Sequence, residues 1–164
     1  MHDQLDTYRS NFLALKDEAT ALVAGVDEDM LRRPPNPDTW SVAQILDHVN
    51  TAGWLLLNSL EQAIQDASQN GPYGEPPFRY GFVSRWFVRS MKPEEFRALQ
   101  DQFATCVVDA EGLDLRRLRV SSPAVPLLRI SVGAWFEATV AHQQRHLDQG
   151  RDVIQALGVA QPST

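Results

Sequence analysis

Apolar residues recur every three or four positions in four long stretches of the chain, which is the spacing of an amphipathic helix. The pattern predicts helices over residues of about 3–24, 41–67, 93–112 and 131–157. No stretch alternates apolar and polar residues for long enough to predict a strand. Four helices of similar length without strands favour an all-α four-helix bundle, with residues 1–164 as a single domain.

Two local signals refine this picture. The segment Ser41-Val-Ala-Gln44 reads as a capping box, in which a serine hydroxyl and a glutamine amide each satisfy a backbone group at a helix start. Residues 69–93 form a connection rich in glycine and proline that is long enough to run the full height of a bundle. The second and third long helices can therefore run parallel, rather than as an antiparallel hairpin.

Composition narrows the class of protein. The chain has 15 basic and 21 acidic residues, and the net charge of -6 argues against nucleic acid as a general partner, although a local basic patch is not excluded. The most apolar run, 52–57, is too short to span a membrane. No signal peptide is visible, and the lone Cys106, which we expect to be a small core residue, permits no intrachain disulfide. We therefore expect a soluble cytoplasmic protein.

Three histidines lie on the inner faces of two predicted helices. His142 and His146 are four residues apart, so their Cβ atoms are about 5–6 Å apart on the same side of the last helix. His48 falls between Ile45 and Ala52 on the helical wheel and faces inward as well. If the two helices are neighbours, the three neutral imidazoles can bind one divalent ion.

Three protein ligands leave an open coordination position, as in catalytic metal sites, so the reactive group would be a metal-bound water or thiolate. Imidazole suits Zn, Ni, Cu and Fe, and we expect Zn or Ni. The alternative is a set of core histidines hydrogen-bonded to neighbouring polar groups. A histidine pair on a helix is weak evidence by itself, and the third inward histidine shifts the balance towards a metal.

Five other residues are candidates for the pocket beside this site. Thr139 and Gln143 flank His142 on the last helix. Arg79 and Arg85, with Trp86, could form an anion-holding lid for a carboxylate-bearing thiol. The alternative for each arginine is a solvated side chain above buried aromatic rings. Apolar faces left uncovered by four helices could also support a homodimer.

Residues 39–48 (TWSVAQILDH) and 141–147 (AHQQRHL) resemble the two signature segments of the DinB-like superfamily. This is a superfamily of small bacterial bundles named for a damage-inducible protein. The resemblance implies a bundle with up-down-down-up topology, and a divalent metal bound by one histidine early in the second helix and a histidine pair in the fourth. Those positions correspond here to His48, His142 and His146 without a departure.

The resemblance also implies a range of functions. Relatives include bacillithiol and other thiol S-transferases, so it suggests a metal-dependent thiol transferase or hydrolase-like enzyme that uses a low-molecular-weight thiol and a small-molecule substrate. A second hypothesis is a non-catalytic metal-binding or interaction module in which the ion is a structural staple. A third, DNA binding in a damage response, rests on the family name, and the acidic balance of the chain weighs against it.

Overall fold

The computed structural model describes residues 3–75, 93–122, 125 and 127–158 of the chain. None of the helices in this part is long and apolar enough to cross a lipid bilayer. Its elements are, in chain order, α1 (Asp3–Val23), α2 (Glu28–Arg32), α3 (Val42–Asn70), α4 (Pro93–Asp109), β1 (Arg119–Ser121), β2 (Arg129–Ser131) and α5 (Val132–Ala156).

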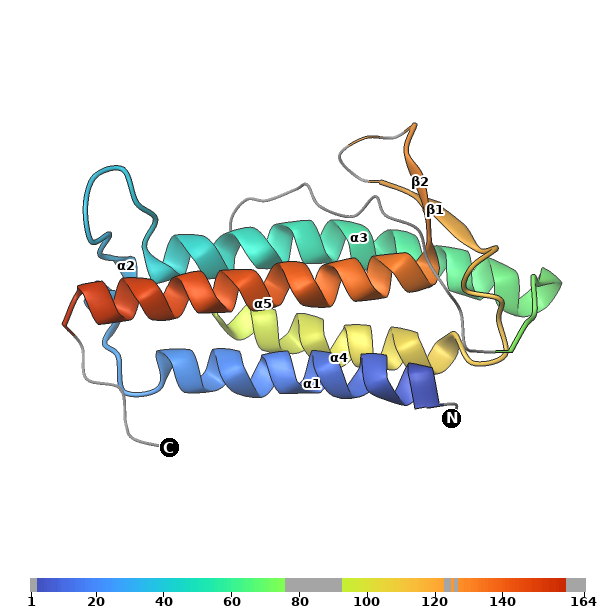
Figure 1. Ribbon diagram of the computed structural model, residues 1–164, viewed down its shortest axis with the longest axis horizontal. Helices are drawn as coiled ribbons and strands as arrows, with labels where there is room; N and C mark the ends of the chain where they lie inside the picture. Colours follow the sequence, from blue (N-terminus) through green and yellow to red (C-terminus); the bar gives the residue numbers. More distant parts are fainter. Residues whose placement is uncertain (1–2, 76–92, 123–124, 126, 159–164) are drawn as a thin grey trace.

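The four long helices lie side by side as a bundle (Figure 1). α1 and α5 run in one direction, and α3 and α4 run in the other, which is the expected up-down-down-up order. α1 packs against α4 and α5, and α3 packs against the same two helices. α4 and α5 are therefore diagonal partners across the bundle axis, and the all-α fold predicted from the sequence is confirmed.

All four predicted helices are present, with ends within three residues of the expected positions. The expectation of no strands was wrong, because β1 and β2 form an antiparallel hairpin between α4 and α5. Each strand has three residues, and one side chain of each, Val120 or Ile130, is buried. Three residues are too few for an alternating pattern to be detected in the sequence. The short helix α2, capped by the side chain of Asp27, was also missed.

The loop between α4 and β1 fixes the start of α5. Ser131 is the N-cap residue of α5, but its side chain makes no capping hydrogen bond. The backbone N–H groups of Val132 and Gly133 instead donate to the carbonyl oxygens of Leu118 and Leu115, at 2.9 and 3.2 Å. Donors that a helix start would leave unpaired are thus satisfied by the preceding loop. The same contacts set the height of α5 in the bundle.

An aromatic layer crosses the core between three helices. Phe12 of α1 stacks on Phe103 of α4 with ring centroids 4.7 Å apart, and it meets Phe136 of α5 edge-on at 6.1 Å. All three rings are fully buried. Because large rings pack in few ways, this layer fixes the heights of α1, α4 and α5 relative to one another.

The capping box at the start of α3 is confirmed. The hydroxyl oxygen of Ser41 accepts a hydrogen bond from the N–H of Gln44 at 3.2 Å, and the Gln44 side-chain oxygen accepts from the N–H of Ser41 at 2.9 Å. Such a pair satisfies two backbone donors and defines the first turn of the helix. His48 lies in the second turn of α3, so the cap also fixes the position of this histidine.

We predict that Gln100→Met stabilises the protein. Gln100 on α4 is fully buried, and neither of its amide atoms has a hydrogen-bond partner among the residues that the structure describes. Replacing an unsatisfied amide by an apolar side chain of similar size should raise the free energy of unfolding by about 1–3 kcal/mol. Urea denaturation would measure this change. The matched control, Gln102→Met on the exposed side of the same helix, should change it by less than about 0.5 kcal/mol, and a destabilised Gln100→Met would contradict the prediction.

Candidate metal centre

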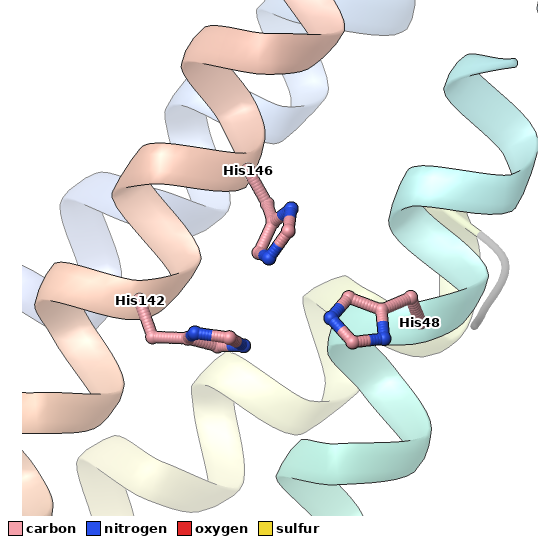
Figure 2. A group of neighbouring side chains, drawn as sticks. All are labelled: His48, His142 and His146. Atoms are coloured by element: carbon pink, nitrogen blue, oxygen red, sulfur yellow. The ribbon is translucent and has the colours of Figure 1, made fainter. Parts of the chain in front are cut away.

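The structure brings together the three histidines singled out from the sequence (Figure 2). His48 comes from α3, while His142 and His146 come from α5, and one ring nitrogen of each lies within 4.8 Å of the others. The ring centroid of His146 is 4.7 Å from that of His48 and 4.7 Å from that of His142. The centroids of His48 and His142 are 5.7 Å apart. All three rings point towards the space between the two helices.

The convergence follows from the topology. α3 and α5 are antiparallel neighbours, so the beginning of α3 lies beside the second half of α5. His48 is in the second turn of α3, and His142 and His146 are near the middle of α5. A spacing of four residues puts the latter two on one side of α5, one turn apart. The triad is therefore assembled from a local spacing on one helix and a single long-range helix contact.

Burial favours the neutral form of His142 and His146. His48 is fully buried, His146 is 2% exposed, and His142 is partly exposed. Burial, together with the nearby His146 and Arg145, lowers the pKa of His142 to about 4. Burial also lowers the pKa of His146, against the opposing effect of a hydrogen bond to Gln149. The neutral imidazole, with a free lone pair, is the form that binds a metal ion.

The hydrogen bonds leave ring nitrogens available. The Nδ1 atom of His146 lies 3.0 Å from the side-chain oxygen of Gln149. The Nε2 atoms of His142 and His146 are buried, and neither has a hydrogen-bond partner within the described part of the chain. A buried polar atom without a hydrogen-bond partner is uncommon, and a water molecule or an ion usually satisfies it. Here the unpaired atoms belong to the same cluster.

The donor set fits a divalent ion. Zinc binds imidazole nitrogens at about 2.0–2.1 Å, so two nitrogens on a tetrahedral ion are about 3.3 Å apart. The upper limit of 4.8 Å between the ring nitrogens is larger, so a small rotation of the rings would close the group around an ion. The cluster contains three imidazoles and no carboxylate among the described residues. Three ligands leave a coordination position for an exogenous group.

Two of the pocket candidates lie inside the bundle. Thr139 is 7% exposed and Gln143 is 1% exposed, both on the inner side of the helix that carries the histidine pair. Neither amide atom of Gln143 has a hydrogen-bond partner within the described ranges. The other candidates, Arg79, Arg85 and Trp86, lie outside the described residues.

One side chain that contacts the triad was missed in the sequence. It is Gln149 of α5, three residues after His146. Asp148 forms an ion pair with Arg151, while Gln149 contacts His146. The spacing of three residues between His146 and Gln149 was the available signal, since such residues are neighbours on a helix.

Trp40 and Cys106 have clear structural positions. The ring of Trp40, which precedes the cap of α3, packs against His48 with centroids 5.4 Å apart. It therefore covers one side of the cluster.

Cys106 is buried in the core as expected, and burial, with the nearby Glu61 and Asp109, raises the pKa of its thiol. This thiol is protonated at neutral pH and is not a nucleophile.

A separate groove of about 390 Å³ lies between α1 and α5 and includes none of the three histidines. Its carboxylates already have partners. Glu137 accepts a hydrogen bond from the hydroxyl of Tyr8 at 3.0 Å, and Glu18 accepts from Gln144 at 2.9 Å and pairs with Arg151. These contacts join α1 to α5 and explain the groove as a packing feature.

We predict that the metal-free protein loses stability as the pH falls from about 6.5 to about 4. In the unfolded chain a histidine has a pKa near 6.5, whereas folding lowers that of His142 to about 4. Between these values the unfolded state binds more protons, so the free energy of unfolding decreases as the pH decreases. Chemical denaturation at a series of pH values would measure it.

Carboxylates also titrate near the lower end of this pH range and change the stability of any variant. The informative quantity is therefore the difference in pH dependence of the free energy of unfolding between the wild type and a variant without this imidazole. The variant His142→Phe should depend less steeply on pH than the wild type does. Identical slopes in the two proteins would show that His142 is not held neutral by the fold.

Comparison with known proteins gives a family and one distant relative. The sequence profile of the DinB superfamily matches residues 11–149. The chain is also similar to the uncharacterized protein YuaE of Bacillus subtilis (strain 168), with 18% identity over 146 residues that cover 81% of this chain and 88% of that protein. No solved structure matches the chain at a significant level.

Proposed function

The chain belongs to the DinB superfamily, and we propose that His48, His142 and His146 bind one divalent metal ion that serves a thiol-dependent reaction of a small molecule. The observation that supports this proposal is the buried cluster of three histidines, with one ring nitrogen of each within 4.8 Å of the others. Family membership and the cluster are compatible with metal binding. The thiol-dependent reaction is inferred from the resemblance to thiol S-transferases of this superfamily, and the neutral donor set is compatible with it.

Energetics favour an ion over a set of plain core histidines. The Nε2 atoms of His142 and His146 are buried without a partner in the described part of the structure. A buried polar atom that loses its hydrogen bond to water destabilises the fold by about 1–3 kcal/mol. Two such atoms in one cluster would be a large penalty for a packing role, whereas coordination to one ion satisfies both. Imidazole donors suit zinc, nickel, copper and iron, and of these we propose zinc or nickel.

The protein groups determine what the ion could do. A divalent ion acts as a Lewis acid and lowers the pKa of a coordinated water or thiol. Because the three ligands are neutral imidazoles, they do not reduce the charge of the ion, which favours an anionic partner such as a thiolate. His142 is the partly exposed member of the triad, so an exogenous ligand would approach beside it. Thr139 and Gln143 are the buried polar groups on the same helix that would contact this ligand.

The proposed partners are a low-molecular-weight thiol and a small-molecule substrate. The net charge of -6 disfavours nucleic acid as a general partner. We retain a cytoplasmic location as part of the proposal, since the single cysteine is compatible with a reducing compartment. A homodimer stays a prediction from the class of fold.

The alternative is a structural ion that joins α3 to α5 without catalysis. The nearly complete burial of His48 and His146 favours it, because a structural ion needs no access to solvent. The two functions differ in ligand exchange. A catalytic ion must accept an external ligand, while a structural ion only raises stability.

We predict that protein purified without an affinity tag or chelator contains about one divalent ion per chain. His48→Ala and His146→Ala should each weaken the affinity for zinc by more than about 100-fold, because loss of an outer partner of a ligand alone weakens it about 10–100-fold. Elemental analysis and competition with a chromophoric chelator would measure both quantities.

His2→Ala is the matched control for this experiment, since it removes the fourth histidine of the chain and keeps His48, His142 and His146. It should leave both the metal content and the affinity unchanged. Undiminished metal in His146→Ala would exclude the proposed ligands.

We predict that the cobalt-substituted protein binds a small thiol directly at the metal. Titration with cysteine should produce a thiolate-to-cobalt charge-transfer absorption in the near ultraviolet, because the open coordination position accepts an anionic sulfur. Serine, which differs only in carrying a hydroxyl, is the control ligand and should produce no such band. A spectrum that cysteine does not change, with cobalt still bound, would favour the structural ion instead.

A further inference from the structure

The contact between His146 and Gln149 favours one tautomer of the imidazole ring. Its Nδ1 atom lies 3.0 Å from the Oε1 atom of Gln149. A carboxamide oxygen has no hydrogen and can only accept, so the Nδ1 atom must donate. A neutral imidazole has one N–H group, and the lone pair of His146 is therefore on Nε2.

The other side of the ring is arranged accordingly. The Nε2 atom of His146 is buried and has no hydrogen-bond partner among the residues that the structure describes. The ring lies with its centroid 4.7 Å from those of both His48 and His142, so it is the member of the triad closest to the other two. A ring with its lone pair directed into a cluster of this kind is ready to coordinate an ion.

We infer that Gln149 is a positioning residue of the metal centre, which fixes the tautomer and orientation of His146 so that Nε2 faces the other two imidazoles. The inference rests on the proposed metal site. Histidine ligands in metal centres commonly donate their second N–H group to an acceptor that orients the ring. In this protein the acceptor is a neutral amide rather than a carboxylate, so it orients the ring and adds no negative charge beside the ion.

The backbone that carries Gln149 is held firmly. Gln149 is three residues after His146 on α5, so the hydrogen bond is local to one helix and exists without an ion. The next residue, Gly150, lies so close to α1 that a Cβ atom there would be 2.8 Å from a methyl carbon of Leu22. The close approach of the two helices keeps this turn of α5 in place. The ring of His146 is therefore oriented before an ion binds.

The experiment compares three variants by their zinc affinity, measured by competition with a chromophoric chelator. Gln149→Leu removes the acceptor with little change of size and should weaken zinc binding about 10–100-fold. Gln149→Glu keeps an acceptor oxygen at this position and should bind zinc at least as tightly as the wild type. Gln155→Leu, on an exposed site of the same helix, is the matched control and should have no effect.

A second readout separates positioning from a general loss of structure. Long-range ¹H–¹⁵N correlation spectra of the metal-free protein, with the His146 ring assigned from a His146→Gln spectrum, should show the Nδ1–H tautomer in the wild type. The same ring in Gln149→Leu should shift towards the Nε2–H tautomer, with the fold retained as judged by circular dichroism. A residue that only stabilises the helix would change the melting temperature and not the tautomer.

The outcomes distinguish this inference from the proposed function. Zinc binding and a His146 tautomer that are both unchanged in Gln149→Leu would overturn the positioning role and leave the metal site intact. Weak binding in Gln149→Glu, equal to that in Gln149→Leu, would also overturn it, since the acceptor would then not matter. A wild-type protein that shows the Nδ1–H tautomer and binds no zinc would overturn both the proposed site and the role of Gln149 in it.

Discussion

The antiparallel packing of α3 against α5 decides where the three imidazoles lie. His48 reaches the histidine pair of α5 because the start of α3 lies beside the second half of α5, next to the middle of that helix. Two other features hold this height. The capping box of Ser41 and Gln44 begins α3, and the loop carbonyls before α5 satisfy its first donors. The site therefore depends on how both helices begin, as well as on the residues that compose it.

Some side chains in the core of the bundle are polar, at positions where a helical bundle usually buries apolar residues. Gln100 and Gln143 are almost completely buried, and their amide atoms have no partners in the described ranges. Such groups reduce stability. The aromatic layer of Phe12, Phe103 and Phe136 and the long apolar faces of the helices offset this loss. Gln143 lies next to His142 in the chain, and buried polar groups that reduce stability are common at functional sites.

The electrostatic character of the cluster follows from its donors. Burial favours the neutral state of His142 and His146, and the acceptor on His146 is an amide. An ion held by this set would keep its full positive charge and would attract an anionic ligand on the side where His142 is exposed. The proposed thiol chemistry and the positioning role of Gln149 both arise from this neutral surround. The thiol chemistry requires a bound ion, whereas the hydrogen bond between Gln149 and His146 is formed within α5 alone.

The sequence by itself determined the local features of this protein. Helical periodicity located the four long helices, a four-residue motif located the cap of α3, and the helical wheel placed His48 on an inner face, because each of these depends on residues close together in the chain. Only the tertiary structure decided that α3 is the neighbour of α5 and that β1 pairs with β2, and it selected the rotamers with which Gln149 contacts His146. Periodicity reports which face of a helix is buried and not what covers it. A strand of three residues exists only through its pairing partner, and a side-chain hydrogen bond depends on rotamers that packing selects.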